Sequence, residues 1–146
     1  MKGIVFWIFI IFVFFSAVYF YFIQSKVSRN QETAYQDKSD FIKVYQPQPR
    51  SVIKSPLLLE GEARGLWFFE ASFPIRLIDE NGKEIAVAIA QSQGDWMTKD
   101  FVSFKAVMEF EPIAVGKGFL VFQKDNPSGL PENDDELRFP VFISSE

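Results

Sequence analysis

The chain has 146 residues, a formal net charge of −4 at pH 7, and neither cysteine nor histidine. The acidic balance argues against a nucleic-acid partner, because phosphates favour a basic protein face. The missing cysteines exclude disulfides and thiolate metal sites, and the missing histidines remove the commonest general base and transition-metal ligand.

The first predicted element is a membrane anchor at residues 1–23. Residues 4–23 contain no charged residue and no Gly, Pro, Asn or Gln, and a helix needs about 20 apolar residues to cross the hydrocarbon core of a bilayer. The run is too long for the apolar region of a cleavable signal peptide. Trp7, Tyr19 and Tyr21 lie towards its ends, where aromatic rings favour the headgroup region. The sequence therefore predicts a single transmembrane signal anchor.

The charges that flank this run give little information on its orientation. Lys2 and the α-amino group precede it, and Lys26 and Arg29 follow it. The positive-inside rule compares Lys and Arg on the two sides of a span, and here the two sides nearly balance. We expect the rest of the chain to lie on the extracytoplasmic side.

A polar stalk is predicted for residues 24–40, which are mixed in charge and show no periodic apolar pattern. As a flexible coil, such a segment has a root-mean-square span of about 20–25 Å. In the alternative, the anchor helix continues to about Glu32, because the segment contains no Gly or Pro. Residues 41–146 are then long enough for one domain.

This domain is predicted to be all-β, because its apolar residues alternate in short runs between turn residues. Asn81-Gly82 indicates a tight hairpin, and Pro47, Pro49 and Pro56 indicate an edge strand or a crossing between sheets. About seven short strands are typical of an immunoglobulin-like β-sandwich. They are expected at residues 41–45, 57–63, 73–79, 84–91, 101–110, 119–124 and 137–144.

Three stretches of this domain are similar to one known family: Ser55–Leu77 (SPLLLEGEARGLWFFEASFPIRL), Gly94–Phe104 (GDWMTKDFVSF) and Lys124–Ile143 (KDNPSGLPENDDELRFPVFI). Together they resemble the Gmad2 family, the immunoglobulin-like domain of bacterial spore germination, over roughly residues 41–143. The resemblance implies a bacterial extracytoplasmic β-sandwich, often tethered to a membrane or attached to other surface domains, without catalytic activity. We expect this chain to be a single-pass protein of the bacterial cytoplasmic membrane.

Two loops are candidate binding sites, and the first contains Arg64, Trp67, Phe68 and Phe69. Three consecutive aromatic residues on an extended chain cannot all point inward. At least one is expected to be exposed as a partner contact, because aromatic residues dominate binding hot spots. In the alternative, Trp67 and Phe69 plug the end of the sandwich, and Phe68 lies under Glu70 or Arg64.

The second loop, Asp125–Glu136, is a candidate calcium site, and calcium is the one cofactor that the sequence suggests. Hard cations take about six to eight oxygen ligands. The spacing of the acidic residues is not that of an EF-hand, and the alternative is a solvated connection between the last two strands. The candidate ligands are Asp125, Asn126, Glu132, Asp134 and Asp135.

No catalytic site is predicted. Asp79, Glu80 and Glu84 flank the tip of a hairpin, which offers no cleft, and no serine lies in a G-x-S-x-G elbow. We expect a non-catalytic interaction or scaffolding module of the bacterial envelope that binds a protein or a glycan. The alternative is a cation- or small-ligand-binding accessory domain of a membrane complex.

Overall fold

The computed structural model describes Tyr19 and residues 37–111 and 116–144. Within these ranges no helix is both long enough and apolar enough to span a bilayer. Except for Tyr19, the predicted anchor at 1–23 lies outside the described residues, and so do residues 24–36 of the predicted stalk. The fold described below belongs to one compact unit, Tyr35–Glu146.

The described part of this unit contains eight strands and two short 3₁₀ helices. The strands are β1 (Ile42–Gln46), β2 (Val52–Ile53), β3 (Leu57–Arg64), β4 (Ser72–Asp79), β5 (Glu84–Ser92), β6 (Phe101–Met108), β7 (Gly116–Gln123) and β8 (Glu136–Ile143), and the helices are η1 (Gly65–Trp67) and η2 (Pro131–Asn133). The prediction of an all-β domain is confirmed. Seven strands lie within a few residues of their predicted bounds, whereas β2 was not predicted.

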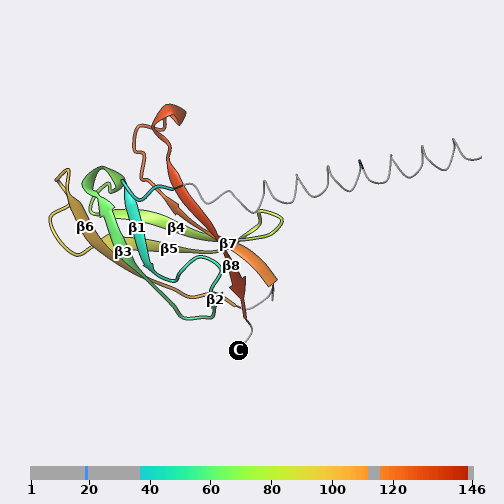
Figure 1. The fold of residues 1–146 in the computed structure, drawn as a ribbon. Coiled ribbons are helices and arrows are strands. Elements are labelled where there is room, and N and C mark those ends of the chain that lie inside the picture. The colour runs from blue at the N-terminus through green and yellow to red at the C-terminus, as the bar shows by residue number, and fades with distance from the viewer. Residues whose placement is uncertain (1–18, 20–36, 112–115, 145–146) are drawn as a thin grey trace, which may run out of the picture. The chain divides into compact units, whose positions relative to one another are not determined.

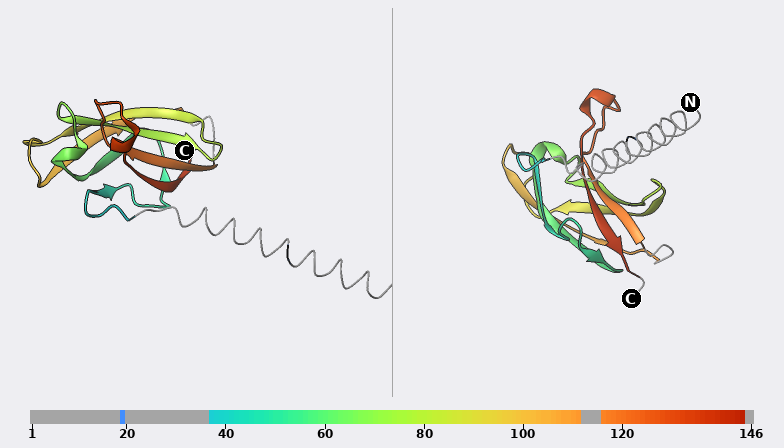
Figure 2. Two further views of the ribbon diagram at one scale, coloured as in Figure 1. Left: turned by 90° about the horizontal axis from the view of Figure 1, so that it is seen from above. Right: turned by 45° about the vertical axis from the view of Figure 1, so that its right-hand side comes forward.

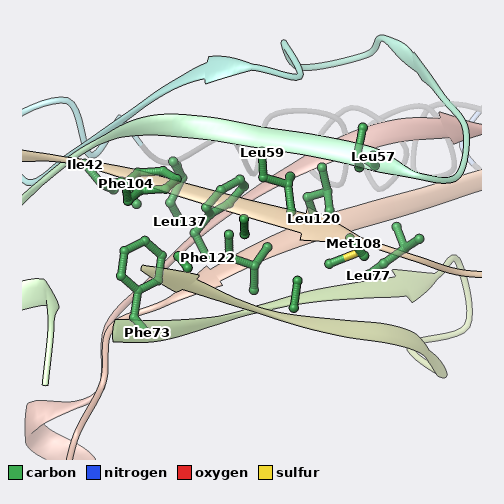
Figure 3. Packing of buried hydrophobic residues seen from close by; sticks show 14 of the residues in the cluster. Ile42, Leu57, Leu59, Phe73, Leu77, Phe104, Met108, Leu120, Phe122 and Leu137 are labelled. Carbon is green, nitrogen blue, oxygen red and sulfur yellow. The ribbon is translucent and has the colours of Figure 1, made fainter. Parts of the chain in front are cut away.

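All eight strands belong to one hydrogen-bonded sheet in the order β1-β3-β6-β5-β4-β7-β8-β2 (Figure 1). β5 pairs with β4 along its length, but with β6 only at Gln91 and Ser92. The sheet bends at this narrow junction, so that β3 and β6 lie across the core from β4 and β5 (Figure 3). The result is a β-sandwich, as the alternating pattern predicts.

The chain between β1 and β3 contains prolines and forms the additional strand β2. Because proline has no N–H to donate, Pro47 and Pro49 interrupt pairing, and the chain crosses to the other end of the sheet. There β2 runs parallel to β8, with Val52 opposite Phe142. The predicted edge position is confirmed, because β1 and β2 are consecutive in sequence but form the two opposite edges of the sheet.

A continuous series of phenylalanine rings runs through the core, whose packing Figure 3 shows. Phe68, Phe73, Phe104, Phe122 and Phe139 follow one another with ring centroids 5.2, 5.0, 6.1 and 5.5 Å apart. Such ring pairs contribute about 0.5–1.5 kcal/mol each beyond the burial of their area. Because Phe68 follows η1, the series connects the core directly to one end of the sandwich.

β5 has an unusual distribution of side-chain sizes. Ala88 and Ala90 point into the core and are buried, whereas Val87 and Ile89 are 43% and 51% exposed. The alternation in the sequence separates these two faces without showing which is internal. Ala90 pairs with Phe73, whose ring occupies the core space beside it, so small residues fit there and the large aliphatic residues lie outside.

Candidate functional site

The two predicted binding loops meet at one end of the sandwich, where they line an open groove of about 560 Å³. The loop Asp125–Glu136 extends beyond the ends of β7 and β8 and contains η2 (Figures 1 and 2). A third segment, the connection between β5 and β6, completes the groove. The lining residues are Gly65, Leu66, Phe68, Phe69, residues 96–99, residues 124–128 and Asn133.

The first loop begins with η1, which changes the direction of successive side chains. Trp67 and Phe68 are both buried, at 2% and 4% exposure, while Phe69 is 39% exposed and Leu66 is 74% exposed. Successive residues of a 3₁₀ turn are about 120° apart, so the strict alternation of a strand does not hold here. Phe69 is the exposed aromatic residue, and the alternative in which it plugs the sandwich is wrong.

Arg64 holds the groove wall in place from within the domain. Its Nε donates a hydrogen bond to the carbonyl oxygen of Asp40 at 3.0 Å, and its Nη1 donates to that of Lys99 at 3.2 Å. The guanidinium carbon also lies 4.1 Å from the centroid of the Phe101 ring. Arg64 therefore positions the β5–β6 connection, and it does not line the groove.

The β5–β6 connection approaches Gly65 very closely. A Cβ atom at Gly65 would lie 2.0 Å from the carbonyl oxygen of Thr98 and 2.2 Å from that of Trp96, so only glycine permits this packing. Met97 N–H donates to Asp95 Oδ1 at 3.0 Å, which is a local turn typical of Asp. This turn presents Met97 to solvent with 77% of its surface exposed.

The acidic loop is organised by the side-chain amide of Asn126. Its Nδ2 donates to the carbonyl oxygen of Leu130 at 2.8 Å and to Asp134 Oδ1 at 2.7 Å. Its Oδ1 accepts hydrogen bonds from Ser128 N–H at 3.2 Å and from Ser128 Oγ at 2.5 Å. The loop is joined to the first loop because Asp125 N–H donates to the carbonyl oxygen of Trp67 at 3.0 Å.

These bonds do not bring the predicted calcium ligands together. The oxygen of Asn126 accepts from Ser128, Asp134 accepts from Asn126, and Asp135 pairs with Lys38 at 2.6 Å. Among the residues that the structure describes, no three or more acidic side chains are grouped to hold a metal ion. The expected coordination by Asp125, Asn126, Glu132, Asp134 and Asp135 is therefore not formed. The ion pair also shows that Lys38, within the predicted stalk, contacts the domain.

The groups with a shifted pKa lie outside this groove. Lys43 Nζ lies 2.8 Å from Glu62 Oε1, and the hydrogen bond that Lys43 donates lowers the pKa of Glu62. The Glu62 carboxylate accepts a hydrogen bond from the Tyr45 hydroxyl, which raises the pKa of Tyr45. At the Asn81-Gly82 turn, the backbone N–H of Lys83 lowers the pKa of Asp79. These carboxylates support a strand pair and a turn, and they do not form a catalytic pair.

Sequence reasoning missed the two most exposed apolar groups at this site, Leu66 and Met97. A signal was available for each of them. Asp95 two residues before Met97 favours a turn with Met97 at its tip, and Gly65 directly precedes Leu66. Neither signal shows that the two turns lie side by side, because that depends on long-range strand pairing.

A family model described as the immunoglobulin-like domain of bacterial spore germination, Gmad2, matches residues 41–130. No curated protein and no solved structure matches the chain. Every residue that lines the groove lies within the matched range except Asn133.

Proposed function

Because the chain belongs to the Gmad2 family of immunoglobulin-like domains of bacterial spore germination, we propose that it is a non-catalytic interaction module that binds a protein partner in the groove at the end of its sandwich. One observation carries this proposal. Three segments far apart in sequence converge on an open groove, and its rim bears Met97 and Leu66, the most exposed of all the large hydrophobic side chains that the structure describes.

The chemistry of the groove favours a protein segment with apolar side chains. Phe69 adds an aromatic surface at 39% exposure beside the aliphatic Leu66 and the thioether of Met97. Methionine adapts its shape to irregular apolar surfaces, and exposed apolar patches of this kind mark interaction sites. Lys99 and Asp125 also line the groove, so charged groups at its margin can fix the orientation of the partner.

The proposed location is the extracytoplasmic side of the bacterial cytoplasmic membrane, with residues 1–23 as the anchor. Its support is the uncharged run of residues 4–23, which has the length of a membrane span. The full-length chain should stay in the membrane pellet after alkaline carbonate extraction, and protease added to spheroplasts should digest the domain. Recovery in the carbonate supernatant, or complete protection from protease, would contradict this location.

The binding site can be tested by capture from crosslinked native membranes with the tagged full-length chain. Leu66→Glu and Met97→Glu place a charge on the rim without disturbing the core. Each should weaken partner binding by about 2 kcal/mol or more, which is roughly thirtyfold in Kd. Val107→Glu is the matched control, because Val107 is 60% exposed on β6 and does not line the groove.

The outcomes separate the groove from the anchor. Loss of one specific protein in both rim variants, with its retention in the control, supports the proposal. A partner captured equally by all three variants contradicts it, and a partner that needs only residues 1–23 would assign binding to the anchor.

A further inference from the structure

One long side of β5 is not paired with another strand. Residues 84–90 pair with β4 alone in the described part of the chain, because the pairing with β6 is limited to Gln91 and Ser92. Further along, Ile85 and residues 109–111 line an open cavity of about 560 Å³. β5 and β6 therefore separate towards this end, which leaves β5 with a free edge.

The backbone groups on this edge can be assigned from their neighbours. Ser92 N–H donates to the carbonyl oxygen of Ala71, whereas Gln93 N–H donates to that of Ser103, next to β6. Successive backbone groups of a strand alternate in direction. The N–H and C=O groups of Val87 and Ile89 therefore point towards the free edge, in the position that antiparallel pairing requires, whereas Ile85 lies at a β-bulge that breaks this alternation.

The side chains beside this edge are apolar and carry little charge. Val87 and Ile89 are 43% and 51% exposed on the outer face, and Pro74 of β4 lies next to Ile89 in the sheet. Between Glu84 and Ser92 there is no charged residue. The carboxylate of Glu84 is itself paired with Arg76 of β4.

The two terminal strands of the sheet, β1 and β2, are better protected than β5 against pairing with another chain. β1 is followed by Pro47 and Pro49, and β2 has only two residues and is flanked by Arg50 and Lys54. Prolines, charges and short length protect edge strands from pairing with other chains. Beyond Glu84 and the bulge at Ile85, β5 contains no proline and no charge, and it is nine residues long.

We propose that the free edge of β5 pairs with β5 of a second copy of this chain, antiparallel about a two-fold axis at Val87. This register places Val87 opposite Val87, where the two copies exchange both backbone hydrogen bonds, and places Ile89 opposite the bulge at Ile85. The same register places Glu84 opposite Ala90, so no like charges meet. A two-fold interface requires such self-complementarity, and this surface is separate from the groove at the end of the sandwich.

The test uses cysteine crosslinking of the full-length chain, which contains no cysteine of its own. In the proposed register, two Val87→Cys side chains face each other across a hydrogen-bonded pair with Cα atoms about 5.5 Å apart, within the range for a disulfide. Mild oxidation should therefore give a covalent dimer. Leu58→Cys in β3 is the matched control, because Leu58 is also 43% exposed but lies on a different strand, opposite Val107 of β6 and outside the proposed interface.

Adding Ile89→Lys to Val87→Cys should reduce the dimer by about tenfold or more, because the lysine would be buried against an apolar strand. A dimer that forms with Val87→Cys, is weak with Leu58→Cys and is lost with Ile89→Lys supports the proposal. Equal crosslinking of both cysteine variants overturns it, as does a dimer unaffected by Ile89→Lys. A crosslink from Val87→Cys to a different protein also overturns it, and would show that the edge takes another partner.

Discussion

At the scale of single residues, Gly65 is the residue on which the shape of the groove most depends. It is the first residue of η1 and is buried against the β5–β6 connection, and its N–H donates to the carbonyl oxygen of Asp100 at 3.2 Å. The two backbones touch because no side chain separates them. Met97 and Leu66 are close enough to form one rim only while this contact exists.

Gly65→Ala should therefore destabilise the domain by about 1–3 kcal/mol, the usual cost of overpacking. Gly94→Ala is the control in the same region, because its added Cβ would meet only Val102 Cγ1 at 3.8 Å, and it should change stability by less than about 0.5 kcal/mol. Urea denaturation of both variants measures the difference. Equal stability of the two variants would show that the close contact at Gly65 is not essential.

Glu62 gives the domain a pH dependence with a defined sign. The pKa of Glu62 is lowered in the folded state, first by the hydrogen bond from Lys43. The ionised carboxylate therefore contributes stability above the ordinary glutamate pKa of about 4.3, and this contribution is lost as the pH falls through the lower folded-state pKa. Glu62→Gln should flatten the fall of Tm below about pH 4.3. Tm curves of variant and parent that stay parallel from pH 5 to 3 would exclude this role.

At the scale of elements, the strands were predictable and the loops were not. Apolar residues with a period of two placed seven strands, because burial of one face imposes that period. β2 was missed because two residues cannot show a period. In β5, Phe73 and not the sequence of the strand itself determines that Ala88 and Ala90 are internal.

The predictions for the two loops failed for a different reason. The sequence does not show which hydrogen bonds a polar side chain already makes within the folded domain. Asp125–Glu136 has enough oxygens for calcium, yet Asn126, Ser128 and Lys38 use several of them. The three aromatic residues after Leu66 were assigned by strand alternation, which η1 interrupts. The expectation that at least one of them is exposed rested on the same alternation, and Phe69 is the residue that is exposed.

Asn126 should control the order of the acidic loop. Asn126→Ala removes its bonds to Leu130, Ser128 and Asp134 and should lower stability by about 1 kcal/mol, a typical net value for lost hydrogen bonds. Hydrogen exchange should rise within residues 126–134 and remain unchanged in β3. Glu132→Gln, an exposed position of the same loop, serves as the control, and equal exchange in the two variants would refute this role.

At the scale of the whole molecule, stability should be highest in the strands that have a neighbour on each side. β3, β6, β4 and β7 occupy internal positions of the sheet, while β1 and β2 are its edges. Local opening is easiest where a segment makes few buried contacts and where its backbone hydrogen bonds are exposed to solvent. Native-state hydrogen exchange should therefore be slowest in β3, β6, β4 and β7 and fastest in β2. Protection of β2 equal to that of β3 would contradict this order.

The position of β2 also determines how the domain responds to a stretching force. β2 lies near the start of the domain and β8 near its end, and the two run parallel. Pulling Lys38 and Ser144 apart would slide these strands along each other and load their hydrogen bonds together, whereas pulling residues 72 and 92 would peel β4 from β5 one pair at a time. Single-molecule stretching should give a higher rupture force in the first geometry. The parallel pairing of β2 with β8 should thus act as a mechanical clamp on the domain.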